Sequence, residues 1–591
     1  MLPRVPLLAL VVLALAAPTC PESNVRAGAL AERGRVWERF ETLGWIRGDF
    51  ANPFDPDEIR VDGEFVAPDG SSITMPGFYT REYRRALVGG YEHLTPYGDD
   101  HWAVRMTPTM PGTWSWRWVV TTQNGVETTD WRAFDVDPPA PDRHGFLHRS
   151  PLDARYLRFD DGSPWIGVGE NLCWYDGRGT FAYDDWIAKL AAQGVTFIRL
   201  WMPSWAFGLE WTVRAPDGSV ASSSLGDYRD RLDRAWQLDY VMDLAARNGI
   251  AVMLSIQNHG AFSLTNNSEW ADNPYNAANG GPLATPAEFL TNAEARALFQ
   301  RRLRYLVARW GAATNLQAWE LWNEADLVAS GAAMTAWHAE MADALRGLDP
   351  YQHPISTSRA SANASAAYWS LPEIDFTQVH FYSFPLPLDM PSVVAPLLGQ
   401  HLAAQVKPTL LGEYGVDYRG PAETLENDPD GIGFHQGLWI GLLAGGFGTG
   451  LSWWWDNVVD PEDYYFHFGA IARFAAGVAF DAQGFEPIRP AVAADGRNLA
   501  AYALRGRAAV LAWVQNVDHQ WLLPPLPGPD PTPVEGATLA LTGVTDGAWT
   551  ARWIDAYTGM DIATEPVTVA GGAATLAVPT FAKDVALRME R

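Results

Sequence analysis

The sequence is poor in cysteine and in basic side chains. It has only 2 Cys among 591 residues, Cys20 and Cys173, so a framework of disulfide bonds is not expected. Its 43 Lys and Arg residues are outnumbered by 69 Asp and Glu residues, which gives a formal net charge of −26. Such a chain repels the phosphates of nucleic acids and of anionic membranes, and neither is expected as a partner.

Long apolar runs are also missing. The run at residues 7–17, behind the basic Arg4, is too short to cross a bilayer, which takes about 20 residues. A basic residue followed by a short apolar run makes residues 1–20 typical of a signal peptide. We therefore expect a secreted or cell-surface protein with no transmembrane span. Cys20 stands where a lipid-attachment cysteine would, although residues 17–19 match the usual preceding motif poorly.

Three kinds of motif are absent from the chain. No cluster of His, Cys and Asp has the spacing of metal ligands, so we expect no catalytic metal and no cofactor. No Gly-x-Ser-x-Gly elbow is present, which argues against an esterase. The run Gly167-Val168-Gly169-Glu170-Asn171 lacks the third glycine and the helix start of a dinucleotide-binding loop.

Aromatic side chains are abundant, with 28 Trp and 20 Tyr. Flat and partly exposed rings suit the apolar faces of sugars, although packing in large cores accounts for most of them. The length is sufficient for two to four domains.

The pattern of apolar and polar residues changes twice along the chain. Residues 30–140 contain short alternating runs, such as residues 113–118, and end in the Pro-rich segment 137–142. This pattern predicts an N-terminal β-sandwich followed by a linker. Residues 145–486 alternate apolar runs with helical patterns, and residues 487–591 return to alternation, which predicts a small C-terminal β-domain.

The central region contains eight candidate strands separated by helical segments. This alternation predicts a (β/α)₈ barrel, enlarged by loops beyond the usual ~250 residues. One helix is expected at residues 227–248, with Gly249 as its stop. An open doubly wound sheet is the alternative fold. The candidate strands are residues 165–169, 197–202, 251–257, 317–322, 355–358, 376–382, 409–413 and 449–455.

Two glutamates end the fourth and seventh of these strands. Glu324 follows the Trp-rich run 319–322, and Glu413 precedes the turn Tyr414-Gly415. Because the active site of a (β/α)₈ barrel lies at the carboxyl ends of its strands, the two carboxylates indicate hydrolysis of a glycosidic bond. The competing interpretation for each is a buried ion pair or a loop cap. Glu320, on the same strand as Glu324, is a rival acid.

The Asn323-Glu324 pair and the strand-end Glu413 resemble the retaining glycoside hydrolases of clan A, especially family 5-like β-glycanases. The resemblance implies Glu413 as nucleophile and Glu324 as acid and base in a double displacement. The N-terminal sandwich is similar to accessory domains that precede such barrels. Further matching positions are Arg199, which holds the nucleophile ionised, His259 on the third strand, His380 and Tyr382 on the sixth, and either Trp453 or Trp455 as a sugar platform.

The two glutamates need different protonation states. Glu413, near the cationic Arg199 and the hydroxyl of Tyr382, is expected to have its ionised form favoured. Glu324, in a Trp-rich setting beside a second negative charge, is expected to keep its proton longer. Asn323 is expected to bond a substrate hydroxyl.

Several other polar residues are weaker candidates. Glu170 and Asn171 could contact a sugar at an outer subsite or cap a helix, and Asp456 and Asn457 could line the cleft. Cys173 is expected to be a small buried side chain.

The expected partner is a polysaccharide or oligosaccharide. Glucan, mannan, galactan and agar-type chains all remain open, as do internal and terminal cleavage. A transglycosylase with the same two glutamates and a non-catalytic carbohydrate-binding scaffold are the alternative functions.

Overall fold

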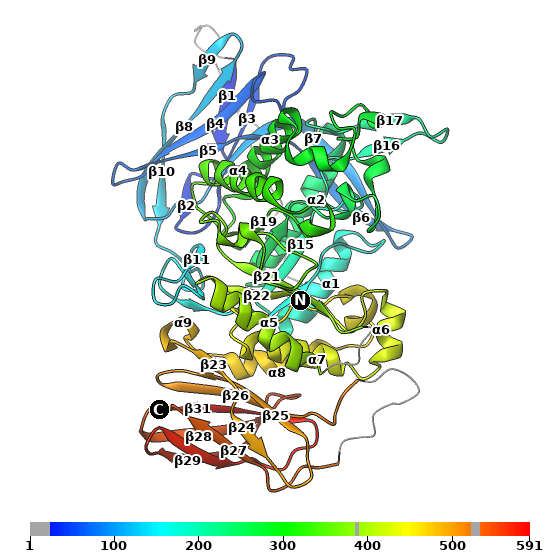
Figure 1. Ribbon diagram of the computed structural model, residues 1–591. Coiled ribbons are helices and arrows are strands. Elements are labelled where there is room, and N and C mark those ends of the chain that lie inside the picture. Colours follow the sequence, from blue (N-terminus) through cyan, green and yellow to red (C-terminus); the bar gives the residue numbers. More distant parts are fainter. Residues whose placement is uncertain (1–23, 385–388, 522–531) are drawn as a thin grey trace.

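The computed structural model describes residues 24–384, 389–521 and 532–591. Figure 1 shows three parts stacked along the long axis of the molecule. The predicted signal peptide at residues 1–20, with Cys20, lies outside the described residues. None of the described helices combines the length and the apolar character needed to cross a membrane.

The N-terminal part is a β-sandwich. One sheet has the order β1-β3-β7-β6 and the other β2-β10-β8-β4-β5, with β9 paired to β8. Along β8, Trp114, Trp116 and Trp118 are buried and alternate with less buried neighbours, as the two-residue period of a strand requires. The strands are β1 Val25–Ala29, β2 Arg33–Arg35, β3 Phe40–Ile46, β4 Ile59–Val66, β5 Ser72–Pro76, β6 Phe78–Val88, β7 Tyr91–Met106, β8 Gly112–Thr122, β9 Gly125–Thr128 and β10 Arg132–Asp137.

Strands β6 and β7 continue beyond the sandwich. Of β7, only the last part, from Trp102 to Met106, pairs with β3. The pairing of β6 with β7 continues to the turn, where Val88 of β6 lies opposite Tyr91 of β7. The protruding two-stranded segment, residues 82–97, is called the β6–β7 ribbon below. It runs along helices of the central part.

A buried ion-pair network joins the sandwich to the central part. Arg105 of β7 and Arg309 both donate hydrogen bonds to Asp239. Burial alone would raise the pKa of Asp239, but the two guanidinium groups hold it well below its usual range. Because breaking a buried pair leaves an unpaired charge, the network fixes the sandwich in place.

The central part is a (β/α)₈ barrel, as the sequence predicts. Strands β14, β15, β18, β19 and β20 form one parallel sheet, and β21 and β22 a parallel pair. The segment 448–452 takes the eighth position, with parallel bridges from Gly448 to Gly167 and from Ser452 to Tyr414. Between β20 and β21, the N–H of Asp375 donates to the carbonyl of Ile355 at 2.7 Å. The strands are β14 Gly169–Asn171, β15 Phe197–Trp201, β18 Ala251–Ser255, β19 Leu316–Glu320, β20 Ile355–Ser356, β21 Thr377–Tyr382 and β22 Thr409–Gly415.

Helices surround this ring in all units but one. Between β20 and β21 only the short 3₁₀ turn η7 (Ala367–Ser370) is present. The helix expected at residues 227–248 is α2, which Gly249 follows with a left-handed φ of 70°. The helices are α1 Thr180–Ala192, α2 Leu232–Arg247, α3 Ala293–Trp310, α4 Ala332–Leu348, α5 Met390–Ala404, α6 Pro421–Asn427, α7 Ile432–Leu443, α8 Tyr465–Ala475 and α9 Phe480–Gln483.

Three short strands precede the barrel, and two pair within a barrel loop. The first set, β11 Leu147–Arg149, β12 Leu157–Phe159 and β13 Pro164–Trp165, is antiparallel. The hairpin of β16 (Thr212–Arg214) and β17 (Val220–Ser223) belongs to the loop after β15.

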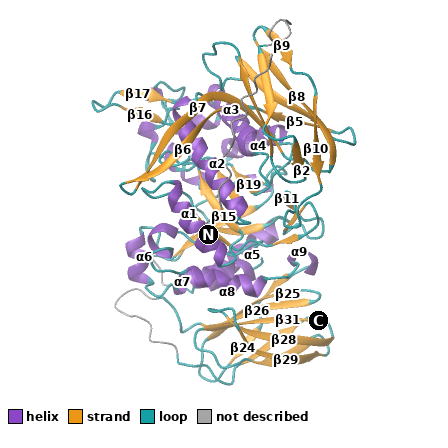
Figure 2. Cartoon of the chain, turned by 180° about the vertical axis from the view of Figure 1, so that it is seen from behind, coloured by secondary structure: helices purple, strands orange, loops and turns teal. Residues whose placement is uncertain are grey.

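The C-terminal part has two further sheets, β23-β25-β26-β31-β28-β29 and β24-β27-β30. Every residue of α7 is buried, because this helix lies between the barrel and the larger sheet (Figure 2). A helix that is apolar all round needs cover on every side. The strands are β23 Glu486–Ile488, β24 Ala491–Ala493, β25 Leu499–Arg505, β26 Ala509–Asn516, β27 Thr538–Thr542, β28 Gly547–Asp555, β29 Asp561–Val569, β30 Ala573–Ala577 and β31 Asp584–Glu590.

Candidate active site

Glu324 lies just beyond the carboxyl end of β19. Its backbone is left-handed, with φ 51° and ψ 47°, a conformation that costs a non-glycine residue about 1–3 kcal/mol. Its N–H donates to Ser358 Oγ at 3.0 Å, and the next N–H, of Ala325, donates to the Ser358 carbonyl at 3.2 Å. Residues that follow β20 thus hold the Glu324 turn in its strained form.

Glu413 lies within β22 and receives two hydrogen bonds from neighbouring strands. The hydroxyl of Tyr382, at the end of β21, donates to Oε1 at 2.6 Å, and Arg199 Nη1 of β15 donates to Oε2 at 3.2 Å. The Glu413 side chain is 6% exposed. Its carboxylate is therefore oriented on both oxygens.

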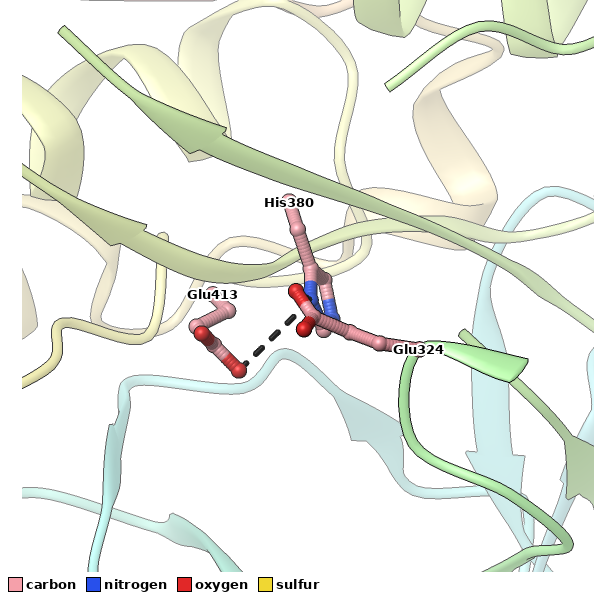
Figure 3. A group of neighbouring side chains, drawn as sticks. All are labelled: Glu324, His380 and Glu413. Atoms are coloured by element: carbon pink, nitrogen blue, oxygen red, sulfur yellow. Dashed lines mark hydrogen bonds and ion pairs between the residues drawn. The ribbon is translucent and has the colours of Figure 1, made fainter. Parts of the chain in front are cut away.

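The carboxylates of Glu324 and Glu413 converge with the ring of His380 (Figure 3). One oxygen of each glutamate and a ring nitrogen of His380 all lie within 4.8 Å of one another. His380 Nδ1 is 3.0 Å from Glu324 Oε1 and 3.5 Å from Glu413 Oε2. An approach this close is nearer to the ~5–5.5 Å between the carboxyls of retaining glycosidases than to the ~6.5–9.5 Å of inverting ones.

Arg199 donates hydrogen bonds to two carboxylates, in addition to those to the amide oxygens of Asn171 and Asn323. Nε and Nη2 each donate to Glu320 at 2.8 Å, whereas Nη1 donates to Glu413 at 3.2 Å. Burial would raise the pKa of Glu320, but the charge of Arg199 lowers it below its usual value. Glu320 is thus an ionised partner of Arg199, which argues against Glu320 as the rival acid.

Burial raises the pKa of both Glu324 and Glu413. For Glu413, the neighbouring charge of Glu324 adds to the rise, while His380, Arg199 and Tyr382 oppose it without cancelling it. The expected net stabilisation of ionised Glu413 is therefore not found, because burial dominates and Glu320 takes the shorter bonds of Arg199. Two carboxylates this close share a proton and titrate as a pair.

His259 lies next to the Glu324 carboxylate, and Asn323 lies next to His259. Asn323 is fully buried, its Oδ1 accepts from Arg199 Nη2 at 2.6 Å, and its Nδ2 lies 3.2 Å from His259 Nδ1. His259 Nδ1 is 3.5 Å from Glu324 Oε2. Burial lowers the pKa of both His259 and His380, which favours their neutral forms. The amide oxygen of Asn323 is already engaged by Arg199, which leaves only its N–H groups for a ligand.

Two family matches cover much of the chain. Residues 34–121 match a domain of unknown function, DUF5060, and residues 160–428 match Cellulase (glycosyl hydrolase family 5). The second match contains β14 to β22 and both glutamates of the converging pair. The central domain is a clan A glycoside hydrolase domain.

The hydrolase domain is similar to curated fungal mannanases. Mannan endo-1,4-beta-mannosidase F of Aspergillus fumigatus is 26% identical over 301 residues, covering 45% of this chain and 64% of that protein. Mannan endo-1,4-beta-mannosidase A of Emericella nidulans is 26% identical over 278 residues, covering 43% and 64%. The chain thus spans less than two thirds of the length of these relatives.

Two solved structures from Bacteroides vulgatus ATCC 8482 share the fold. A candidate glycoside hydrolase aligns over 95% of this chain and 100% of its own, with 16% identity and a TM-score of 0.62. A glycoside hydrolase of family 5 aligns over 76% and 93%, with 14% identity and a TM-score of 0.51. The first alignment extends beyond the hydrolase domain into both flanking parts.

Of the two tryptophans predicted as a sugar platform, only Trp453 offers a face to a ligand. Trp455 is 2% exposed, whereas Trp453 is partly exposed. Trp454 between them has a left-handed φ of 68°, which turns the chain so that Trp455 is buried. The Trp453 ring packs against Trp174 at 5.5 Å and Trp201 at 5.2 Å between centroids.

The sequence analysis missed the tryptophans that surround Trp453. Trp174 contacts Trp201 at 5.6 Å and Trp205 at 5.3 Å, and Trp205 is 44% exposed. We call Trp174, Trp201, Trp205 and Trp453 the aromatic wall. The available signal was the position of Trp174, three residues beyond Asn171 at the end of the first strand.

Glu170 and Asn171 close the ring of strands instead of facing a ligand. Glu170 accepts hydrogen bonds from Ser452 Oγ at 2.5 Å and Ser452 N at 3.3 Å. Asn171 Nδ2 donates to the carbonyls of Leu451 at 3.1 Å and Ser452 at 2.8 Å. Both residues are buried, so neither an outer subsite nor a helix cap describes them. Cys173 is fully buried, as expected.

The Glu324, His380 and Glu413 group could supply three ligand atoms to a metal ion. However, Glu413 already accepts hydrogen bonds from Tyr382 and from the cationic Arg199. A fixed positive charge 3.2 Å away repels a second cation. The group therefore suits acid–base chemistry better than metal binding.

A small pocket of about 30 Å³ lies between the loops that follow β15 and β18, and neither Glu324 nor Glu413 lines it. Polar lining residues include Ser204, Asn258 and Glu269. Ser204 Oγ donates to Glu269 at 3.0 Å. Asn258, which precedes His259 in the chain, is the lining residue next in sequence to the carboxylate site.

Proposed function

We propose that this chain is a retaining glycoside hydrolase that cleaves β-glycosidic bonds in a polysaccharide by double displacement. The observation that carries the proposal is the approach of Glu324 and Glu413 to within 4.8 Å at the mouth of the barrel. This separation suits attack by one carboxylate and proton donation by the other.

In the first step, Glu413 attacks the anomeric carbon as the bond to the leaving oxygen breaks. Glu324 gives its proton to that oxygen, so the products are a glycosyl ester on Glu413 and a free sugar end. Glu413 is the nucleophile because Tyr382 and Arg199 donate hydrogen bonds that stabilise its charge. His380 Nδ1 lies 3.0 Å from Glu324 Oε1, and burial favours the protonated form of Glu324.

In the second step, a water takes the place of the departed sugar. Glu324, now ionised, removes a proton from the water as its oxygen attacks the anomeric carbon. The ester bond breaks, Glu413 is regenerated, and the product keeps the original β configuration. Glu324 is again protonated and ready for the next cycle.

We propose a β-1,4-mannan as the first substrate to test. The relatives named above are mannan endo-1,4-beta-mannosidases, and the partly exposed face of Trp453 suits the apolar face of a hexose ring. Glucan, galactan and agar are the comparison substrates.

We also propose that the protein acts outside the cell. The support is the signal-peptide pattern at residues 1–20. Sequencing the N-terminus of the exported protein tests this proposal, and labelling with a fatty acid shows whether Cys20 carries a lipid.

Product sizing on the four polysaccharides, combined with proton NMR of the first product, tests the function. The expected result is cleavage of at least one polysaccharide with the β anomer formed first. Initial formation of the α anomer would replace retention by inversion, and transfer to an added sugar in place of water would indicate a transglycosylase. Binding of polysaccharide without cleavage would indicate a carbohydrate-binding scaffold.

A further inference from the structure

We propose that the tip of the β6–β7 ribbon, residues 87–92, is a distal binding site for the polysaccharide chain that the barrel cleaves. The inference rests on the proposed function and extends it to the N-terminal sandwich. It gives a substrate-binding role to a region that matches a domain of unknown function, DUF5060.

The ribbon tip is anchored at the rim of the catalytic face. Glu92 accepts a hydrogen bond from the N–H of Thr180 at 3.1 Å, and Arg85 donates to Thr180 Oγ1 at 3.0 Å. Thr180 is the first residue of α1, and a helix that follows a barrel strand begins at the strand's carboxyl end. In Figures 1 and 2 the ribbon ends on the same side of the molecule as β16, β17 and α6. These three elements also follow carboxyl ends of barrel strands.

A polar network fixes the tip to the loop between β14 and α1. Gln237 Nε2 donates to Glu92 at 2.5 Å, and the hydroxyl of Tyr175 donates to Gln237 Oε1 at 2.9 Å. The N–H of Glu92 donates to the carbonyl of Gly177 at 3.3 Å. The ribbon therefore has a defined position relative to the loop that carries Trp174.

Contacts connect the tip to the aromatic wall. The ring of Tyr91 packs on Gly177, where an added Cβ would lie 3.0 Å from Tyr91 Cε1. Trp174, three residues before Gly177, contacts Trp453 at 5.5 Å and Trp205 at 5.3 Å. Residues 174–177 of the loop between β14 and α1 thus connect Tyr91 to the aromatic wall.

The tip exposes apolar side chains. Leu87, Val88 and Tyr91 are 47%, 58% and 65% exposed. Gly89 and Gly90 both have positive φ, 61° and 87°, which allows the tight two-residue turn that brings Val88 and Tyr91 together. One side of the Tyr91 ring is backed by Gly177, so the other is free to pack on a sugar.

A polysaccharide fits this position better than other occupants. The net charge of −26 disfavours an anionic membrane. A β-linked sugar chain presents repeated apolar faces that aromatic rings bind, and one extended chain could contact Trp453 and Tyr91 together. A protein partner would not need the tip to be held against the loop that carries Trp174.

The test compares Tyr91→Ala with the wild type on a polysaccharide and on the shortest oligosaccharide that the wild type cleaves. We expect the ratio of kcat/KM for the polymer to kcat/KM for the oligosaccharide to fall about threefold to tenfold. Trp131→Ala is the matched control, because Trp131 is 45% exposed and lies next to β10 of the other sheet. Its ratio should stay within about twofold.

Polymer binding is measured separately in full-length Glu413→Ala, with and without Tyr91→Ala. An unchanged affinity for the polymer, or an unchanged kcat/KM ratio in Tyr91→Ala, overturns the ribbon site while wild-type hydrolysis and the proposed function stand. Conversely, a wild type that cleaves no polysaccharide overturns the proposed function. A Tyr91-dependent loss of polymer binding would still support the ribbon site.

Discussion

Arg199 and Glu320 form a fully buried ion pair in which two nitrogen–oxygen distances are 2.8 Å. Glu413 receives a longer hydrogen bond from the same guanidinium, at 3.2 Å. In the proposed intermediate Glu413 is an uncharged ester, yet Arg199 keeps Glu320 as its counter-ion. The pair therefore spares the intermediate an unpaired buried cation, which would be strongly destabilising.

Replacing Glu320 tests this relationship. Glu320→Gln should lower the free energy of unfolding by about 3 kcal/mol or more, because Arg199 loses its main partner. The pKa of Glu413 should fall, since Glu413 becomes the only carboxylate paired with Arg199. Denaturant unfolding and the acid limb of kcat/KM measure the two effects. The control is Glu340→Gln, which breaks a partly exposed pair with Arg296 and should cost less than about 1 kcal/mol.

Removing the nucleophile should abolish turnover. Glu413→Ala is expected to lower kcat on the order of 10⁴-fold, because the carboxylate that attacks the anomeric carbon is removed. Added azide should restore activity with a substrate that has a good leaving group, and the product should be a glycosyl azide of inverted configuration. Near-normal activity without azide would show that Glu413 is misassigned.

Glu324→Gln should discriminate between leaving groups. Substrates with poor leaving groups need the proton of Glu324, so their kcat/KM should fall about 10²–10⁴-fold. Activated aryl glycosides should form the ester almost normally and then accumulate it, because the second step lacks its base. Rapid-mixing kinetics would show a burst, and an equal loss for both substrate types would contradict the acid role.

Tyr382→Phe removes the 2.6 Å hydrogen bond to Glu413. A bond to a charged group contributes about 1.5–3 kcal/mol, so kcat/KM should fall roughly tenfold or more. The hydroxyl stabilises ionised Glu413, and its loss should raise the pKa of Glu413 and move the acid limb to higher pH. An acid limb at unchanged pH would mean that Tyr382 does not act through Glu413.

The pH profile of the wild type should be a bell displaced towards neutral pH. Activity needs ionised Glu413 and protonated Glu324, and burial raises the pKa of both above the ordinary value of 4.5. Activity is therefore lost on the acid side at a pH above 4.5 and on the alkaline side as Glu324 ionises. In Glu324→Gln the alkaline limb should disappear for activated substrates. An acid limb below pH 4.5 would show that Arg199 and Tyr382 outweigh burial after all.

Strand-end positions could be predicted from the sequence because they depend on local pattern. The apolar runs that end near Glu324 and Glu413 correspond to β19 and β22, and the ring of parallel strands then brings their ends together. Arg199, His380 and Tyr382 meet the same pair for that reason.

Two kinds of contact could not be predicted from the sequence. In one kind, two side chains compete for the same partner, and in the other a single backbone turn decides which side chain is exposed. Whether Arg199 bonds Glu320 or Glu413 is decided by distances inside the barrel. The left-handed φ of Trp454 decides which of its two neighbours, Trp453 or Trp455, is exposed. This backbone conformation is rare for a bulky residue such as tryptophan, so the sequence does not indicate it. The course of the β6–β7 ribbon depends on contacts between segments far apart, such as Glu92 with Thr180.

The buried helix α7 has a consequence for how the enzyme could be divided. Its residues face the barrel on one side and β25 and β26 on the other, so the C-terminal sandwich completes the core of its neighbour. The change in sequence pattern at residue 487 therefore does not separate two independently folding units. Barrel and C-terminal sandwich should be inherited, expressed and unfolded as one unit, unlike a binding module joined by a free linker.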